Sequence, residues 1–378
     1  MKKHLFFVAL AGVALASCVK NEVEAPATKQ VKIGFASPVL YSNVDTKAEV
    51  YGEIGSHKYD GTETVYTYPR EEKFKIFAVE HIGDLTSWAD ATPTGFNEQD
   101  IAWDNSLDAW VPRTSTGGYY YWPDNAKLSF AAMSPAELDI DAATVDYGAT
   151  GLTVDNFVIA DDPAKQYDLL YSERAVNKES TSNGVDGAGY YSGIPITFKH
   201  ALSSIHFSLK TDVTSETVSL VGITLKNAKN SGKFAENITN ETELTRSPYW
   251  TPAENSPIKD YVSFTGSVNF PISAQYVSSL AAQDGTNDDD VSHPLLMMPQ
   301  VLGNDIVVEV KYKVGEEIKT RSVQINQYPA TAPITEWKVG TKYTYRLVYS
   351  KNAQIQDIIY FAPSTEGWDE GDAIEVLL

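Results

Sequence analysis

Cysteine is nearly absent from this chain, since Cys18 is the only one among 378 residues. A disulfide within the chain needs a second cysteine and thiolate metal sites need several, so neither is expected. Long apolar runs are missing too, because no stretch reaches the roughly 20 residues that a membrane-spanning helix requires. We therefore expect packing alone to stabilise the folded part.

The single cysteine follows a short apolar segment. Two lysines precede an apolar run from Leu5 to Leu15, which has the length of the apolar core of a secretory signal peptide. Leu15-Ala16-Ser17-Cys18 resembles a lipobox, in which the thiol is alkylated with diacylglycerol and the peptide is cut before the cysteine. We expect residues 1–17 to be a signal peptide, Cys18 to be lipidated, and residues 18–30 to form a flexible tether. The alternative is an ordinary signal peptide with a cysteine beside it by chance.

Basic residues are few, with 30 Lys and Arg against 50 Asp and Glu. Removal of residues 1–17 takes away two lysines and no acidic residue, so the formal net charge falls from −20 to −22. Such a chain repels nucleic acid and anionic membrane surfaces, and neither is expected as a partner. The lipid on Cys18 is then the only expected membrane anchor.

Motifs of catalysis and cofactor binding are also missing. The sequence has no Gly-x-Ser-x-Gly elbow, no phosphate-binding loop, and no Gly-x-Gly-x-x-Gly after a strand. Asp288-Asp289-Asp290 does not have the spacing of a helix–loop–helix calcium site, and His206, alternating with Ser208 and Lys210, is predicted on a solvated face. We expect no catalytic residue, cofactor or metal, while a spatial pair of carboxylates for glycoside hydrolysis stays open.

Apolar and polar residues alternate along much of the chain, and helical periodicity is nearly absent. Runs of period two separated by Gly, Pro, Asn and Asp predict antiparallel sheets with one buried face, so the fold class is all-β. Strands are predicted at 31–35, 73–78, 117–122, 127–132, 205–210, 218–226, 306–312, 343–349 and 355–361.

The length predicts more than one core. Without residues 1–17 the 378-residue chain has 361 residues, more than a single core usually reaches. Two tandem β-sandwiches are the simplest architecture. We place the N-terminal domain at 31–212 and the C-terminal domain at 213–378, with the boundary in the polar segment Thr211–Ser215.

Four segments, in order along the chain, have distinctive strand or turn patterns rather than catalytic motifs. They are Tyr119–Pro135 (YYYWPDNAKLSFAAMSP), Ile196–Leu209 (ITFKHALSSIHFSL), Leu295–Gln300 (LLMMPQ) and Trp337–Leu347 (WKVGTKYTYRL), the last followed by a further segment at 358–368. Together they resemble the fimbrillin family, the lipoprotein subunits of type V pili, and within it the group similar to the minor fimbrial subunit. The segments at 337–347 and 358–368 are similar to the closing pattern of that family.

The resemblance implies two transthyretin-like sandwiches in a structural adhesion subunit of a surface fimbria. In the family a lipidated precursor reaches the outer membrane, a trypsin-like protease removes the leader with the first strand, and a strand from another subunit fills the exposed groove. An opened sheet edge and an alternating incoming strand are suited to this exchange. The implied partners are other fimbrial subunits, together with a ligand on a host or bacterial surface.

The resemblance also nominates residues for this exchange. Val31, Ile33 and Phe35 belong to the candidate displaced strand. The family often has Thr-Arg-Ala after it, whereas this chain has Thr46-Lys47-Ala48, which an arginine-specific protease would not accept. Arg70 is the next basic candidate, and the alternative for both Lys47 and Arg70 is ordinary loop charge. If neither is cut, the chain stays on its lipid as an anchor or a non-polymerising surface lipoprotein.

The last residues of the sequence alternate as well. Ile374, Val376 and Leu378 form one apolar face, which suits insertion into a groove. The segment is either the donor strand for another subunit or the last edge strand of its own domain.

A second hypothesis is a non-polymerising outer-membrane lipoprotein that binds glycan through clustered aromatic residues. Exposed aromatic rings suit sugar rings, although in β-sandwiches such residues more often fill the core. The candidates are Trp103, Trp110, Tyr119–Tyr121 and Trp122.

Overall fold

The computed structural model describes most of the chain after residue 30. The described residues are 31–36, 38–40, 58–59, 64–65, 68, 70–180, 193–240, 244–270, 272, 294–328, 332–352 and 355–367, of which 39–40, 58–59, 64–65, 351–352 and 355–367 are described by their backbone alone. Within these ranges the chain is built from strands, with two short 3₁₀ helices, η1 (Pro163–Lys165) and η2 (Ile325–Gln327), and no α-helix. The all-β prediction is confirmed. None of the described helices has the length or apolarity to cross a membrane.

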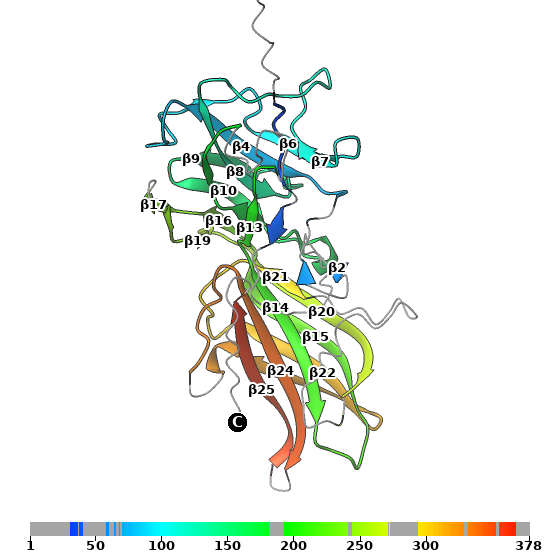
Figure 1. Ribbon diagram of the computed structural model, residues 1–378. Helices are drawn as coiled ribbons and strands as arrows, with labels where there is room; N and C mark the ends of the chain where they lie inside the picture. The colour runs from blue at the N-terminus through cyan, green and yellow to red at the C-terminus, as the bar shows by residue number, and fades with distance from the viewer. Residues whose placement is uncertain are drawn as a thin grey trace, which may run out of the picture.

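The N-terminal part contains a nine-stranded and a four-stranded sheet (Figure 1). The larger sheet has the order β1 (Val39–Leu40), β13 (Thr197–His200), β11 (Leu170–Ser172), β8 (Lys127–Ser134), β4 (Phe74–His81), β6 (Gln99–Asp104) and β7 (Ala109–Val111), with β12 (Ala175–Lys178) beside β8 and β5 (Thr92–Pro93) beside β4. The smaller sheet has the order β19 (Tyr249–Pro252), β16 (Ser231–Ala235), β10 (Gly151–Val158) and β9 (Thr144–Gly148). The N-terminal part also contains two hairpins. They are formed by β2 (Lys58–Tyr59) with β3 (Thr64–Val65), and by β17 (Ile238–Asn240) with β18 (Thr245–Arg246).

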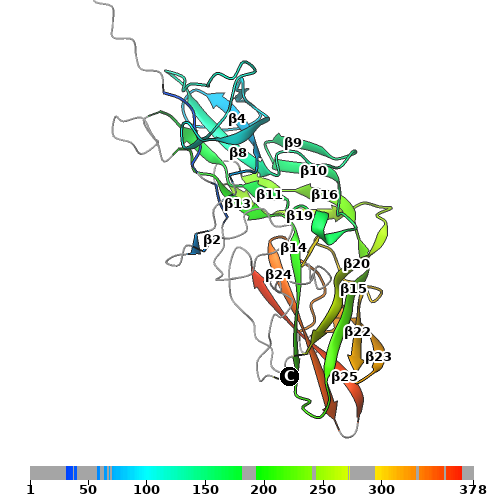
Figure 2. The ribbon, with the colours of Figure 1, turned by 90° about the vertical axis from the view of Figure 1, so that its right-hand side faces the viewer.

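The C-terminal part is a sandwich of two four-stranded sheets. One has the order β21 (Leu295–Met297), β14 (Ser203–Thr211), β24 (Thr341–Asn352) and β25 (Ile355–Gly367). The other has the order β20 (Ile258–Asn269), β15 (Val218–Lys229), β22 (Val307–Val314) and β23 (Glu317–Gln324). Figure 2 shows this sandwich at one end of an elongated molecule and the N-terminal sheets at the other.

Side-chain alternation places the core between the two C-terminal sheets. In β22, Val308, Val310 and Tyr312 are buried while their neighbours are partly or fully exposed. In β24, Tyr343, Tyr345, Leu347 and Tyr349 are buried in the same way. Successive side chains of a strand point to opposite faces, so each strand contributes every second residue to the core.

Two strand pairings differ from the antiparallel expectation. β1 lies parallel to β13, and β14 lies parallel to β24, with Ser204 opposite Lys342 and Thr211 opposite Tyr349. A parallel pair needs a long crossover connection, and for β14 and β24 the strands between residues 211 and 341 supply it. Alternation within each strand carries no information on these pairings.

The strand predicted at 117–122 is wrong as a continuous strand. Only isolated bridges form there, Tyr119 with Arg113 and Tyr121 with Lys32. Gly117 has a φ of 82°, and the Thr114 N–H donates to the Gly118 carbonyl at 3.0 Å. The chain therefore turns at residues 114–118, at the start of the predicted strand, and the aromatic residues that follow pair only through isolated bridges.

The division into domains at 212/213 stays a prediction, and strand pairing crosses that position in both directions. β14 ends at Thr211 but pairs with β24, whereas β16 and β19, after residue 212, pair in the same sheet as β10. One core cluster accordingly contains Leu152 and Phe234 together with Leu225 and Tyr345. A second, separate cluster lies on the larger N-terminal sheet and includes Ile33 and Phe35.

Candidate assembly site

Residues 31–36, here called the leading segment, lie between two parts of the N-terminal sheet region and bond to both. On one side, the N–H groups of Ile33 and Phe35 donate to the carbonyls of Tyr120 at 2.9 Å and Trp110 at 2.8 Å. The Trp122 N–H donates to the Val31 carbonyl at 2.9 Å. The leading segment thus satisfies backbone groups that no other described strand reaches.

The opposite edge of the leading segment bonds to Ile194. The Ala36 N–H donates to the Ile194 carbonyl, and the Ile194 N–H donates to the Gly34 carbonyl, both at 3.0 Å. Three residues after Ala36, β1 begins its parallel pairing with β13, Val39 opposite Thr197. The described residues between 34 and 40 therefore follow one edge, formed by Ile194 and β13.

The leading segment also fills part of a core. Ile33 and Phe35 are 1% and 2% exposed, whereas Val31 is half-buried against the same cluster. The Phe35 ring lies edge-on to Phe74 at 6.0 Å and to Phe130 at 5.5 Å between ring centroids. Such edge-to-face pairs add to the stabilisation from buried area. The predicted alternation is found for Ile33 and Phe35.

Gly193 belongs to this site, although the sequence does not single it out. Its φ is 71°, and a Cβ there would lie 2.4 Å from the Phe35 carbonyl carbon and from the Ala36 nitrogen. Only glycine allows the chain to approach the leading segment so closely in this conformation. Gly193 and Phe35 are remote in sequence, so only the three-dimensional structure shows that they lie side by side.

Arg70 is exposed on the surface of the same region. Its guanidinium carbon lies 4.0 Å from the centroid of the Trp103 ring, and its Nη2 lies 3.5 Å from a carboxylate oxygen of Asp108. The other nominated residues, Cys18, Lys47, Ile374, Val376 and Leu378, lie outside the described residues.

The aromatic residues of the glycan hypothesis line this core rather than a surface. Trp110 and Trp122 are 0% and 6% exposed, and Trp103 and Tyr120 pack partly buried against the same cluster. Of the run 119–122, only Tyr121 is largely open, at 41%. A stacked sugar ring needs an exposed aromatic face, so this group of residues does not support glycan binding.

His206 is not on a solvated face as predicted. It is half-buried, its Nε2 lies 2.7 Å from the Ser204 hydroxyl oxygen, and Ser208 is 4% exposed. Burial, with Lys342 nearby, lowers the pKa of His206 well below its ordinary value. β14 is covered on both faces, and alternation cannot distinguish a covered polar face from a solvated one.

A buried ion pair links β10 and β18 through Glu236, which lies between β16 and β17. The fully buried Glu236 carboxylate accepts the Leu152 N–H at 2.9 Å and the Arg246 Nε–H at 2.6 Å. Burial raises the pKa of Glu236, and these two donors oppose the rise. Within the described residues, no group of three or more His, Cys, Asp and Glu is placed to hold a metal ion.

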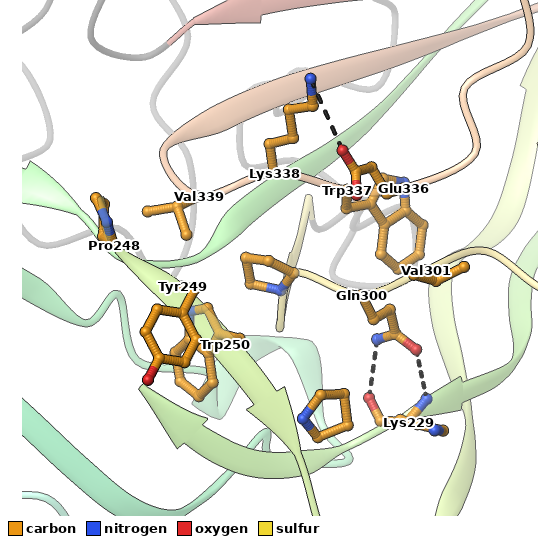
Figure 3. Close-up of a pocket in the computed structure, with 12 residues that line it drawn as sticks. Lys229, Pro248, Tyr249, Trp250, Gln300, Val301, Glu336, Trp337, Lys338 and Val339 are labelled. Carbon is orange, nitrogen blue, oxygen red and sulfur yellow. Dashed lines mark hydrogen bonds and ion pairs between the residues drawn. The ribbon is translucent and has the colours of Figure 1, made fainter. Parts of the chain in front are cut away.

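A pocket of about 550 Å³ lies between β19 and the loops 299–301 and 336–339 (Figure 3). Gln300 bonds to the backbone of Lys229 through both amide atoms, and Glu336 pairs with Lys338 at 3.8 Å. Tyr249, 48% exposed, contributes an open ring. The side chains of Gln300 and Glu336 thus have partners within the protein, and none of the nominated site residues lines the pocket.

Comparison with known proteins decides the family. The family described as Fimbrillin-like matches residues 64–368, most of the chain and most of the strands described above. This chain belongs to the fimbrillin-like family. No curated protein matches it. Membership supports the role of a fimbrial subunit at the cell surface that associates with other subunits.

Two solved structures are similar to this chain at low sequence identity. A fimbrial protein from Bacteroides vulgatus is 17% identical, with a TM-score of 0.52 over 89% of this chain and 99% of that one. A candidate cell adhesion protein from Bacteroides uniformis is 16% identical, with a TM-score of 0.48 over 90% and 99%. At such identities the likeness to the fimbrial protein concerns the fold alone.

Proposed function

We propose that this fimbrillin-like protein is exported as a lipoprotein on Cys18 and becomes a fimbrial subunit when its leading segment is cut away and replaced by a strand of another subunit. The observation that carries this proposal is the leading segment itself, which is bonded along both edges and buries two side chains. Its contacts with the sheet are backbone hydrogen bonds and buried side chains, which a strand of another subunit can also make.

Loss of the leading segment would leave a costly groove. The carbonyls of Tyr120, Trp110 and Ile194 and the N–H groups of Trp122 and Ile194 would lose their partners. A buried polar group without a partner costs about 1–3 kcal/mol, and each exposed Ile or Phe side chain about 1.5–3 kcal/mol. An incoming strand with alternating apolar residues repairs both losses, so the empty groove favours assembly.

The uncut precursor resists exchange because its own segment competes at a high effective concentration. A covalently attached strand acts at millimolar concentration or above, far beyond that of a neighbouring subunit. Cleavage removes this advantage, since the freed segment diffuses away. Lys47 and Arg70 are the candidate cuts, and a chain cut at neither would stay on the lipid at Cys18 as an anchor.

The tail containing Ile374, Val376 and Leu378 is the donor in this proposal. Its alternation matches the spacing of Ile33 and Phe35 on one face. The competing assignment keeps it as an edge strand of its own chain.

Gel ladders test the proposal. Purified protein starting at Cys18 is treated with a trypsin-like protease and run unboiled in detergent. The proposal predicts ladders from the trimmed chain and a monomer from the uncut one.

A deletion variant tests the tail as donor. Deleting residues 373–378 should abolish the ladder. Mixing the trimmed deletion variant with uncut full-length chain should give heterodimers only. A chain trimmed after Lys47 that stays monomeric contradicts strand exchange, whereas ladders from the deletion variant reject only the tail as donor.

The lipid is tested separately. Cys18→Ser should move the protein from the membrane fraction to the soluble fraction and abolish incorporation of labelled fatty acid. Continued labelling of that variant would contradict the lipoprotein assignment.

A further inference from the structure

Tyr68 is buried in the core that holds the leading segment. It is 3% exposed, and its ring contacts three strands, lying 5.8 Å from Phe74, 5.4 Å from Trp110 and 5.7 Å from Phe198 between centroids. Its hydroxyl donates to the Lys73 carbonyl at 2.8 Å and bonds to the Ser134 hydroxyl at 2.7 Å. Burial raises the pKa of this phenol.

Tyr68 and Phe35 occupy neighbouring places in one aromatic cluster. Both rings contact Phe74, and Phe35 also donates its N–H to the Trp110 carbonyl. The Tyr68 N–H donates to the Pro38 carbonyl at 3.3 Å, so Tyr68 lies beside the chain that continues from the leading segment rather than within it. Removal of that chain would leave Tyr68 in place, with its ring as a wall and its N–H as a free donor.

We infer that Tyr68 is a retained wall of the groove, so that the cut permitting strand exchange lies before residue 68 and a cut after Arg70 disables the subunit. This inference rests on the function proposed above. An incoming strand supplies side chains at every second residue along the path of residues 31–36, and that path does not include the position of the Tyr68 ring. The subunit must therefore supply Tyr68 itself.

A cut after Arg70 removes more than the displaced strand. Tyr68 would leave with the fragment, and the fully buried Ser134 hydroxyl would lose its one hydrogen bond among the described residues. Phe74, Trp110 and Phe198 would lose a shared ring contact. A groove that has lost a wall and holds an unpaired polar group binds an incoming strand less tightly.

The surroundings of Arg70 point the same way. A protease must draw several residues around the cut into its active site, and Tyr68 is anchored two residues before Arg70. Arg70 itself lies over Trp103 and beside Asp108. Cleavage there would have to displace these contacts of Arg70 and Tyr68, and we expect it to be slow.

The positions of the arginines make the test direct. Arg70 is the only arginine before Arg113, so an arginine-specific protease acts on the leader of the wild-type chain at Arg70 alone. The double variant Lys47→Arg/Arg70→Gln moves that cut to position 47. Both precursors keep Tyr68, so any difference in assembly arises from the position of the cut; intact mass and N-terminal sequencing confirm each product.

The double variant should form ladders after cleavage, and wild-type chain cut after Arg70 should form at least about tenfold less polymer at equal concentration. In the double-variant background, Tyr68→Phe should polymerise better than Tyr68→Ala, because it keeps the ring. Equal ladders from chains beginning at Glu71 would overturn the inference while leaving strand exchange intact. No ladder from either cut would instead reject strand exchange.

Discussion

Gly193 determines, at the scale of single residues, how closely the chain can approach the leading segment. Its positive φ and its contact with the backbone of Phe35 and Ala36 leave no room for a side chain. Gly117 offers a matched control, because it has a similar φ of 82° and nothing within 4 Å of its Cβ position. A difference between these two glycines isolates the close approach from the backbone conformation.

We predict that Gly193→Ala destabilises the uncut protein by about 1–3 kcal/mol more than Gly117→Ala does. Both variants carry the cost of an alanine at positive φ, about 1–2 kcal/mol, but only the first meets the leading segment. Chemical denaturation measures the difference. Equal losses in the two variants would mean that the leading segment does not pack against residue 193.

His206 gives a prediction about pH. Burial lowers its pKa in the folded state, so the unfolded chain takes up a proton near pH 6.5 that the folded chain refuses. The stability associated with the neutral ring is present above the unfolded pKa and is lost as the pH falls below it, by at most about 1.4 kcal/mol per pH unit. Water reaching the half-buried ring reduces this figure.

The measurement compares wild type with His206→Gln by denaturation at pH 7.5 and pH 5.5. The wild type should lose more stability on acidification than the variant, which has no group titrating at that position. Parallel losses in both proteins would show that His206 is not held neutral by the fold.

At the scale of the element, alternation predicts the long strands well and the assembly site in part. β22 and β24 bury every second residue, so their period is readable from the sequence. The prediction of one continuous strand over 117–122 is wrong because the chain turns at Gly117, before the aromatic residues. Tyr68 and Gly193 lie in no predicted strand. Tyr68 matters because its ring contacts Phe74, which no alternation pattern indicates. Gly193 matters because it lies against Phe35, which is remote in sequence.

The leading segment should act as a separable element. We predict that a synthetic peptide of residues 30–40 prevents ladder formation when added in excess to freshly trimmed subunits, because it refills the groove. The same peptide with Phe35→Asp should have little effect, since a carboxylate cannot replace the buried ring beside Phe74 and Phe130 without a large desolvation cost. Inhibition by both peptides alike would indicate binding elsewhere.

At the scale of the whole molecule, the larger N-terminal sheet and the C-terminal sandwich lie at opposite ends, and the smaller sheet packs against both. Residue alternation does not predict which distant strands pair. It indicates neither the parallel pairing of β14 with β24 nor the pairing of β16 and β19 in the sheet of β10. An elongated subunit whose proposed acceptor groove lies in its N-terminal part would suit end-to-end assembly, and the acidic composition of the chain would favour solubility.

Hydrogen exchange at the Trp122 and Ile194 amides tests the central claim most directly, since both donate to the leading segment in the uncut protein. The two amides should be protected before cleavage, exchange rapidly in the trimmed monomer, and become protected again in the polymer. Protection that survives trimming, or rapid exchange within the polymer, would show that no neighbouring strand takes the place of residues 31–36.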